Sequence, residues 1–282
     1  MKTTFLLSIT LLAGAVTLGS SVGQAHAQEA QQETGQAQQS PQTREAPQTP
    51  DEVFGKDAMA RARAALRKEM GGHTNWLVIG DRLEYQTGEG DPAMLWDIQG
   101  WIGSDTDRLW LKTEGLYLGD EGQLDEGEIQ ALYSRAISPF FDFQAGIRQD
   151  FAAGPKRTYG VLGFQGLAPY WFEIEAAAFI SDKGDVTARI EAEYELLLTQ
   201  RLIFQPRIEV NLSAQNIPEL RTGSGLSSAQ LEGRLRYEFR RTIAPYVGLS
   251  WSRATGRTAK FLRADGEDPG RLSFVTGIRF WF

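Results

Sequence analysis

The sequence has no cysteine and only one long apolar run, and both shortages narrow the possible folds. Without cysteine there is no disulfide scaffold, no thiolate zinc site and no cysteine nucleophile. The mean hydropathy of −0.33 excludes a bundle of membrane-spanning helices. Lysine and arginine number 29 against 36 acidic residues, for a net charge of −7. We therefore expect no nucleic-acid partner, because phosphate binding needs a clustered excess of positive charge.

The long apolar run lies at the N-terminus and has the organisation of a secretory signal. Lys2 precedes an apolar stretch from Phe5 to about Leu18, and Ala25-His26-Ala27 has the A-x-A spacing of a cleavage site. The stretch holds about 14 apolar residues, fewer than the roughly 20 that a membrane-spanning helix needs. We therefore predict a signal peptide over residues 1–27 and export of the chain.

A low-complexity segment follows the predicted cleavage site. From Gln28 to about Asp51 the chain is mostly Gln, Ala, Glu, Pro and Thr, which cannot bury enough surface to order itself. Residues 57–70 have the composition of a helix, and Gly71-Gly72 is a stop signal. We expect residues 28–74 to form a periplasmic low-complexity lead that contains one short helix.

Beyond Asn75 the sequence changes to segments of roughly 10 residues, rich in Val, Ile, Leu and aromatics and separated by turn residues. Alternation is clearest from Val186 to Leu198, where apolar residues share one face and Thr, Arg and Glu share the other. We predict twelve strands, which begin near Trp76, Ala93, Arg108, Glu128, Phe140, Thr158, Tyr170, Val186, Leu202, Ser228, Ile243 and Leu272.

Alternation alone fits a soluble sandwich as well as a barrel, and three features favour the barrel. The strands are long enough to cross a bilayer when tilted, their number is even, and short and longer connections alternate. The chain also ends in an aromatic strand, and Tyr170, Trp171, Trp281 and Phe282 suit an aromatic girdle. The prediction for residues 75–282 is all-β: a closed antiparallel transmembrane β-barrel in outer-membrane lipid, with both ends of the mature chain in the periplasm.

Several ordered segments of this region are similar to the copper resistance protein B family. They are Trp96-Asp97-Ile98-Gln99-Gly100-Trp101-Ile102-Gly103, Arg108-Leu109-Trp110-Leu111-Lys112-Thr113-Glu114-Gly115, Gln130-Ala131-Leu132-Tyr133-Ser134-Arg135, Gly166-Leu167-Ala168-Pro169-Tyr170-Trp171-Phe172-Glu173, Glu193-Tyr194-Glu195-Leu196-Leu197-Leu198-Thr199-Gln200-Arg201-Leu202, Gly223-Ser224-Gly225-Leu226 and Arg279-Phe280-Trp281-Phe282. The resemblance implies an outer-membrane protein of copper tolerance that works beside a periplasmic multicopper oxidase. The last of these segments resembles the signal that the barrel assembly machinery reads.

The resemblance also implies that copper ions are the small partner. Members of the family often carry a Met- and His-rich segment before the barrel, but residues 28–57 here have neither residue type. The thioether and imidazole groups that remain in the mature chain are Met59, Met70, His73 and Met94, which suit Cu(I). Methionines such as Met59 and Met70 are more often packing residues of an amphipathic helix, so a metal role for these residues is a hypothesis.

The charged faces of the predicted strands should line the lumen. We expect this lining to include Glu173, Glu175, Arg189, Glu191, Glu193, Glu195, Arg207, Glu209, Glu232, Arg234, Arg236 and Glu238. Two interpretations stay open: a salt-bridged lining that rigidifies the barrel, and a carboxylate-rich path that attracts cations. A general pore or structural barrel without a metal role is the alternative function.

Catalysis is not expected from this sequence. A serine hydrolase needs a histidine base, and His73, which precedes the first predicted strand, is the one histidine of the mature chain. Paired carboxylates such as Glu191 and Glu193 are explained by a charged lumen face without any catalytic role. We therefore predict a non-enzyme that binds, sequesters or passes copper ions at the outer membrane.

Overall fold

The computed structural model describes residues 49–70, 73–89, 91–119, 122–152 and 154–282. The predicted signal peptide and the lead up to residue 48 lie outside these ranges. Helix α1 (Pro50–Phe54) includes Pro50 and Asp51, the last two residues of the stretch predicted to be disordered, so the prediction is wrong there. Helix α2 (Lys56–Met70) confirms the predicted helix. None of the helices in the described ranges is long and apolar enough to cross a membrane.

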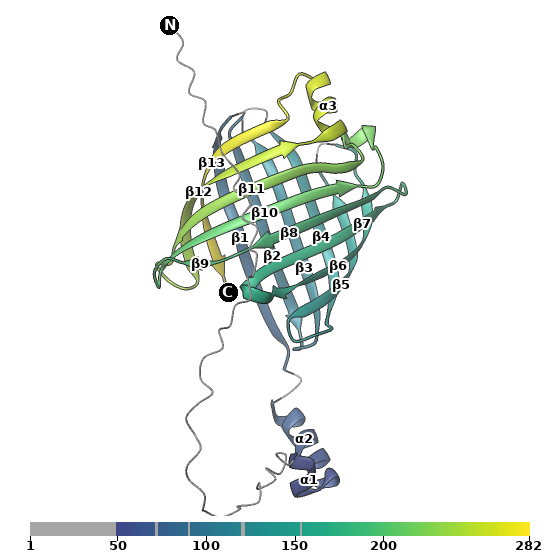
Figure 1. The fold of residues 1–282 in the computed structure, drawn as a ribbon, viewed down its shortest axis with the longest axis vertical. Coiled ribbons are helices and arrows are strands. Elements are labelled where there is room, and N and C mark those ends of the chain that lie inside the picture. The colour runs from purple at the N-terminus through teal and green to yellow at the C-terminus, as the bar shows by residue number, and fades with distance from the viewer. Residues whose placement is uncertain (1–48, 71–72, 90, 120–121, 153) are drawn as a thin grey trace, which may run out of the picture. The chain divides into compact units, whose positions relative to one another are not determined.

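Residues 75–281 form one antiparallel sheet that closes on itself (Figure 1). Its strands are β1 (Asn75–Gly88), β2 (Ala93–Gly103), β3 (Asp107–Leu118), β4 (Gln123–Ala136), β5 (Phe141–Asp150), β6 (Thr158–Ala168), β7 (Phe172–Ser181), β8 (Val186–Glu193), β9 (Leu196–Leu197), β10 (Leu202–Ser213), β11 (Gly225–Tyr237), β12 (Ile243–Ala254) and β13 (Gly270–Trp281).

Closure is achieved by pairing of the first and last strands, for example Gly80 of β1 with Phe280 of β13. Strands β8 and β9 both pair with β10 and form one crossing that is interrupted at Tyr194 and Glu195. The barrel therefore has twelve strand crossings, which confirms the predicted fold class and strand number. An even number brings both ends of the barrel segment to the same rim.

The two rims differ in their connections. We call the rim that holds the C-terminus the terminal rim, and its connections are residues 104–106, 137–140, 169–171, 198–201 and 238–242. We call the opposite rim the loop rim, with connections 89–92, 119–122, 151–157, 182–185, 214–224 and 255–269. The loop rim carries the longest connections, as the alternation of short and long segments predicted.

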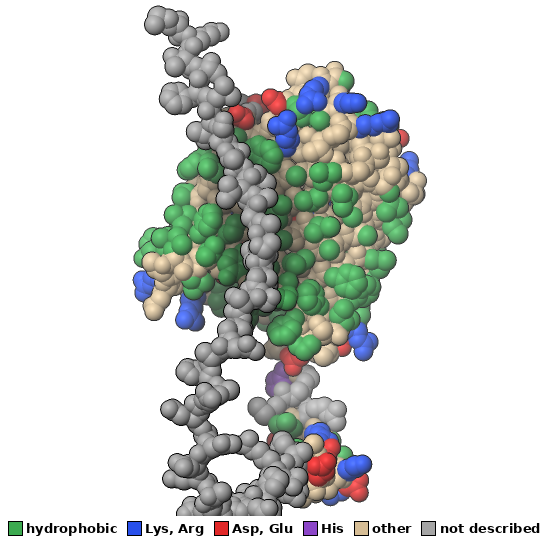
Figure 2. Space-filling model, viewed as in Figure 1, with side chains coloured by type: hydrophobic (Ala, Val, Ile, Leu, Met, Phe, Trp, Pro, Cys, Tyr) green, Lys and Arg blue, Asp and Glu red, His purple; other side chains and the backbone are tan. Residues whose placement is uncertain are grey.

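The barrel wall is apolar on its outer surface. Outward side chains such as Leu162, Leu249 and Phe274 are about half exposed, and Figure 2 shows apolar side chains spread over the wall with Lys and Arg at both ends. Exposed aromatics lie near each rim. Those at the terminal rim include Trp76, Phe140, Tyr170, Trp171, Phe172, Trp281 and Phe282, and those toward the loop rim include Tyr85, Tyr117, Trp251 and Phe274. Two aromatic belts around an apolar band are typical of a barrel in a bilayer.

Two of the connections differ from the predicted ones. Strand β4 begins at Gln123, so the connection expected over residues 119–127 is only residues 119–122. The long connection predicted after β12 contains a helix, α3 (Gly256–Ala264), that the sequence did not suggest. This helix is held to the barrel by its start, where the Thr255 N–H donates to the Ser227 carbonyl at 2.8 Å.

Candidate functional site

A cavity of about 570 Å³ lies inside the barrel, and we call it the lumen cavity. Phe140 from a terminal-rim connection, Leu167 near the end of β6 and Glu173 at the start of β7 line it, so it extends to the terminal rim. Carboxylates outnumber cationic groups in its lining. The carboxylates are Asp81, Asp97, Glu114, Glu128, Asp142, Glu173, Glu175, Glu191 and Glu193, and the cationic groups are Arg82, Arg108, Lys112, Arg189, Arg207, Arg234 and Arg279.

A β-bulge in β1 places two neighbouring charged residues in the lumen. The pairing of β1 with β2 shifts between Gly80 and Arg82, so the alternation changes phase there. As a result both Asp81 and Arg82 line the lumen cavity. Arg82 donates to Asp97 at 3.0 Å and to Glu114 at 2.6 Å. Bulges of this kind re-aim side chains near functional sites.

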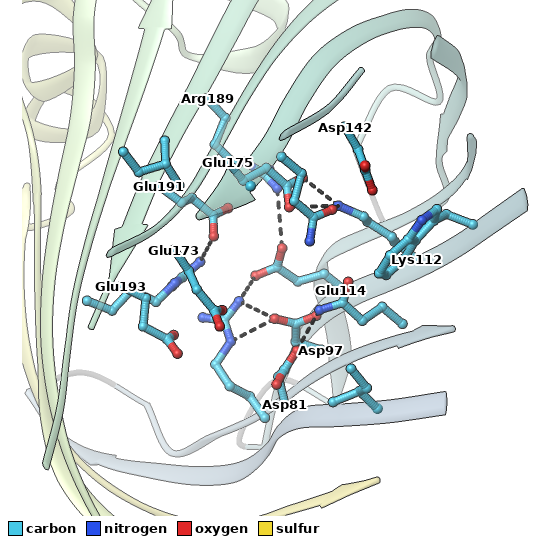
Figure 3. Close-up of a pocket in the computed structure, with 18 of the residues that line it drawn as sticks. Asp81, Asp97, Lys112, Glu114, Asp142, Glu173, Glu175, Arg189, Glu191 and Glu193 are labelled. Carbon is cyan, nitrogen blue, oxygen red and sulfur yellow. Dashed lines mark hydrogen bonds and ion pairs between the residues drawn. The ribbon is translucent and has the colours of Figure 1, made fainter. Parts of the chain in front are cut away.

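Ion pairs reach across the lumen as well as along its wall. Arg189 of β8 lies 3.3 Å from Glu114 of β3 and 3.0 Å from Glu128 of β4. Four strands separate β3 from β8 in the sheet order, so the first of these pairs spans the barrel. Lys112 of β3 makes a similar contact with Glu175 of β7 at 2.6 Å (Figure 3).

A group of buried charges on β1, β10 and β11 adjoins the lumen cavity, and we call it the inner ion-pair cluster. Arg234 contacts Glu84 at 3.0 Å and Glu232 at 2.6 Å, and Arg207 contacts Glu232 at 3.0 Å. Arg82 completes it at 3.8 Å from Glu232. All five side chains are buried, and every carboxylate among them has a cationic or hydrogen-bonding partner. This cluster fills the lumen on that side.

Two carboxylates of the lumen cavity have no cationic partner among the described residues. Glu173 of β7 pairs directly with Glu193 of β8 across the ladder, which puts two like charges side by side. Both side chains extend into the cavity in Figure 3. Glu193 accepts a hydrogen bond from Gln205, whereas Asp81 nearby is bound by Gln99 at 2.6 Å and Arg279 at 3.0 Å. Glu173 and Glu193 are therefore the carboxylates most available to a cation.

The structure places every predicted lumen charge on the inner side of the wall. Seven of them line the lumen cavity: Glu173, Glu175, Arg189, Glu191, Glu193, Arg207 and Arg234. The other five pair within the lumen outside the cavity lining: Glu195 with Arg236 and Arg279, Glu209 with Arg207, Glu232 with Arg234, Arg236 with Glu195, and Glu238 with Arg236. What these residues do stays a prediction.

The predicted copper ligands are not brought together as one set. Met59 is half-buried on α2, Met70 is the last residue of that helix, and His73 is exposed ahead of β1. Met94 is about half exposed on the outward face of β2, where it pairs with Tyr85 toward the loop rim. At about 3.3 Å per residue, Met94 and His73 lie roughly 40 Å apart along β1. Met94 therefore cannot share an ion with His73.

The described residues also hold no cluster of three or more His, Asp or Glu side chains arranged around one metal position. Sequence reasoning missed the part of the lumen cavity that strands β1 to β4 contribute. Its charged members include Asp81, Arg82, Asp97, Lys112 and Glu114. A period of two in the sequence could have predicted part of this lining. It places Arg82, Glu84 and Gln86 on one face and Leu83, Tyr85 and Thr87 on the other.

Comparison with known proteins identifies the family. Residues 74–282 match the family model described as "Copper resistance protein B precursor (CopB)", which covers the whole barrel. The chain belongs to the copper resistance protein B family. It is 43% identical over 226 residues to a "Copper resistance protein B homolog" of Pseudomonas syringae pv. tomato, covering 78% of this chain and 76% of the relative. It is 43% identical over 208 residues to "Copper resistance protein B" of Escherichia coli, covering 74% and 70%.

Among solved structures, the barrel is similar to two porins. The KdgM porin is 11% identical, with 73% of this chain and 99% of the porin covered and a TM-score of 0.48. The NanC porin is 13% identical over 73% and 99%, with a TM-score of 0.49. Membership of the copper resistance protein B family supports a role in copper resistance and a location in the outer membrane.

Proposed function

We propose that this barrel contributes to copper resistance by holding cupric ions in the lumen cavity, which faces the periplasm. The orientation rests on the rims: the short connections and the C-terminus share the terminal rim, and short connections are periplasmic in outer-membrane barrels. The N-terminal segment is then also periplasmic. In this orientation the mouth of the cavity receives ions from the periplasm.

The excess of carboxylates in the lumen cavity carries the proposal. Glu173 and Glu193 face the cavity without a cationic partner among the described residues, so their charge is available to a cation. The lining contains carboxylates and amides but no Met or His. Oxygen donors suit Cu²⁺ rather than Cu⁺, and Cu²⁺ binds a given oxygen and nitrogen site more tightly than the other divalent first-row metals do. The donor set therefore favours the cupric ion as cargo of a non-enzymatic protein.

Copper titration of the folded, processed chain in detergent tests this function. We expect Glu173→Gln together with Glu193→Gln to weaken Cu²⁺ binding by at least about tenfold. The matched control is Asp105→Asn with Asp182→Asn, which removes two exposed carboxylates from connections outside the cavity lining. The control should bind as the unmodified protein does. Equal binding by all three proteins would falsify the assignment of the site to the lumen cavity.

A structural barrel without a metal role is the second candidate, and the ion pairs across the lumen favour it. Arg189 connects β8 to β3 and β4, and the inner ion-pair cluster closes the side near β1 and β11. Such pairs rigidify a barrel and narrow its path for ions. Planar-bilayer conductance separates the two candidates from a general pore: both predict a low conductance, and steady ohmic conduction contradicts both.

A further inference from the structure

A cationic patch lies on the outside of the barrel at the loop rim. It consists of Arg253 on β12 and Arg257, Lys260 and Arg263 on α3, and all four side chains are exposed. The three helical residues recur at every third position, so they share one face of α3. Figure 2 shows blue side chains at this end of the barrel, where Figure 1 places α3.

The opposite side of α3 is fixed to the barrel, which holds the patch in place. Ala259 is buried, and Phe261 and Leu262 are half-buried. The N–H of Gly223, in the connection before β11, donates to the Thr258 hydroxyl at 2.9 Å. A side chain at Gly223 would lie 2.4 Å from the Arg257 Cβ, so glycine permits this close approach.

The four cations have no ion-pair partner within the described part of the chain, although acidic residues are near. Asp265 and Glu267 instead form ion pairs with Arg221, at 3.0 Å and 2.7 Å. The Asp268 carboxylate accepts the backbone N–H of Gly270 at 2.9 Å. In a chain with a net charge of −7, these cations form a local positive surface that the protein does not neutralise.

The position of the patch relative to the apolar wall indicates what neutralises it. Val247, Leu249 and Trp251 are the outward residues of β12, and Arg253 is the next outward residue toward the loop rim. Tryptophan is enriched at the membrane–water interface, so Trp251 marks the edge of the hydrocarbon. Arg253 lies two residues, roughly 7 Å, beyond it. The patch therefore lies at the level of the lipid headgroups.

We propose that this patch binds the phosphate groups of a phosphorylated lipid headgroup in the outer leaflet. Guanidinium groups bind phosphate through paired, charge-assisted hydrogen bonds, and three exposed arginines and an exposed lysine lie close to that level of the barrel. A lipid rather than a soluble anion is the occupant because Arg253 continues the lipid-facing row of β12. The choice of the outer leaflet rests on the orientation proposed above.

Native mass spectrometry of the folded, processed chain tests the proposal, with lipid A bearing two phosphates as the probe. We expect Arg253→Gln, Arg257→Gln and Arg263→Gln together to reduce lipid A retention about tenfold. The matched control, Arg201→Gln, Arg240→Gln and Arg241→Gln, removes the same charge from three exposed arginines at the terminal rim. The control should retain lipid A as the unmodified protein does.

Lipid A with a single phosphate should bind the unmodified protein more weakly than the form with two. Equal losses in the two triple variants would mean that overall charge, not this patch, retains the lipid, and would overturn the proposal. So would displacement of lipid A by inorganic phosphate at an equal phosphate concentration, since the site would then be one for soluble anions. Should the triple variant fail to fold, Lys260→Gln alone must still lower retention. A negative result for lipid A leaves the proposed copper site at Glu173 and Glu193 standing, because the titration of that site does not depend on the patch.

Discussion

Replacement of Arg234 by methionine tests whether the inner ion-pair cluster holds the barrel together. Arg234 is 2% exposed, and its guanidinium contacts both Glu84 and Glu232. Without it, Glu232 keeps Arg207 at 3.0 Å, but Glu84 keeps only the neutral donors Tyr246 and Gln86. A buried carboxylate that loses its cation costs about 3–5 kcal/mol of unfolding free energy. We expect a loss of that size for Arg234→Met.

Urea unfolding in detergent micelles, followed by tryptophan fluorescence, measures this loss. The control is Arg135→Met: the Arg135 side chain is 67% exposed and lies 3.9 Å from Asp107, so its loss costs about 1 kcal/mol or less. Addition of Glu84→Gln to Arg234→Met should recover part of the stability, because it removes the charge left without a cation. The reasoning is wrong if the unfolding free energies of Arg234→Met and Arg135→Met differ by less than about 1 kcal/mol. It is also wrong if the addition of Glu84→Gln lowers the unfolding free energy of Arg234→Met further.

Three further outcomes follow from the same structure. Val247→Arg puts a charge four residues inside Trp251 on the lipid-facing row of β12 and should cost about 2–4 kcal/mol by urea unfolding in lipid, against a smaller cost for Val247→Ala. In the β7–β8 connection, a hydrogen bond from Gln215 and the nearby Arg157 lower the pKa of Asp185. Its contribution to stability is therefore full above its unfolded pKa of about 4 and is lost as the pH falls from there through its lowered folded value. Asp185→Asn should make the thermal midpoint fall less steeply with pH below about pH 4, and should leave its pH dependence above about pH 5 unchanged. Met70→Ala with His73→Ala should lower the affinity for Cu⁺, measured with a competing chelator, and leave Cu²⁺ binding in the lumen unchanged.

Most of the fold was predictable because the hydrophobic pattern of a barrel strand repeats every second residue. One exception on the wall lies just after the break at Tyr194 and Glu195. Glu195 keeps the predicted lumen position and binds Arg236 and Arg279, each at 2.7 Å, but Leu196, Leu197 and Leu198 are then all exposed. A run of three leucines has no period of two, so the sequence gives no sign of where the phase changes.

Helix α3 was missed for a different reason. It has only nine residues, fewer than an isolated helix needs to be stable in water. Its stability comes from docking on the barrel, through the Thr255 N–H bound to Ser227 and the Thr258 hydroxyl bound to Gly223. Those partners are about 30 residues away in the sequence, so local patterns do not contain them.

The lumen cavity was only half predictable. Its β7 and β8 side follows from strict alternation, which places Glu173, Glu175, Glu191 and Glu193 on the lumen face. Its β1 side depends on the bulge that aims both Asp81 and Arg82 inward. A bulge is set by pairing with the neighbouring strands, and a single sequence does not show that pairing.

The two sets of candidate copper donors differ in chemistry as well as in place, and the difference bears on how the protein handles the metal. The thioether and imidazole of Met70 and His73 precede the barrel and are suited to Cu⁺, whereas the lumen carboxylates are oxygen donors suited to Cu²⁺. In this chain residues 28–57 contain no Met or His, whereas the lumen cavity is lined by carboxylate and amide oxygen donors. If the proposed function holds, we expect copper resistance in this chain to depend on Cu²⁺ and on the carboxylate pair Glu173 and Glu193 more than on the segment before the barrel.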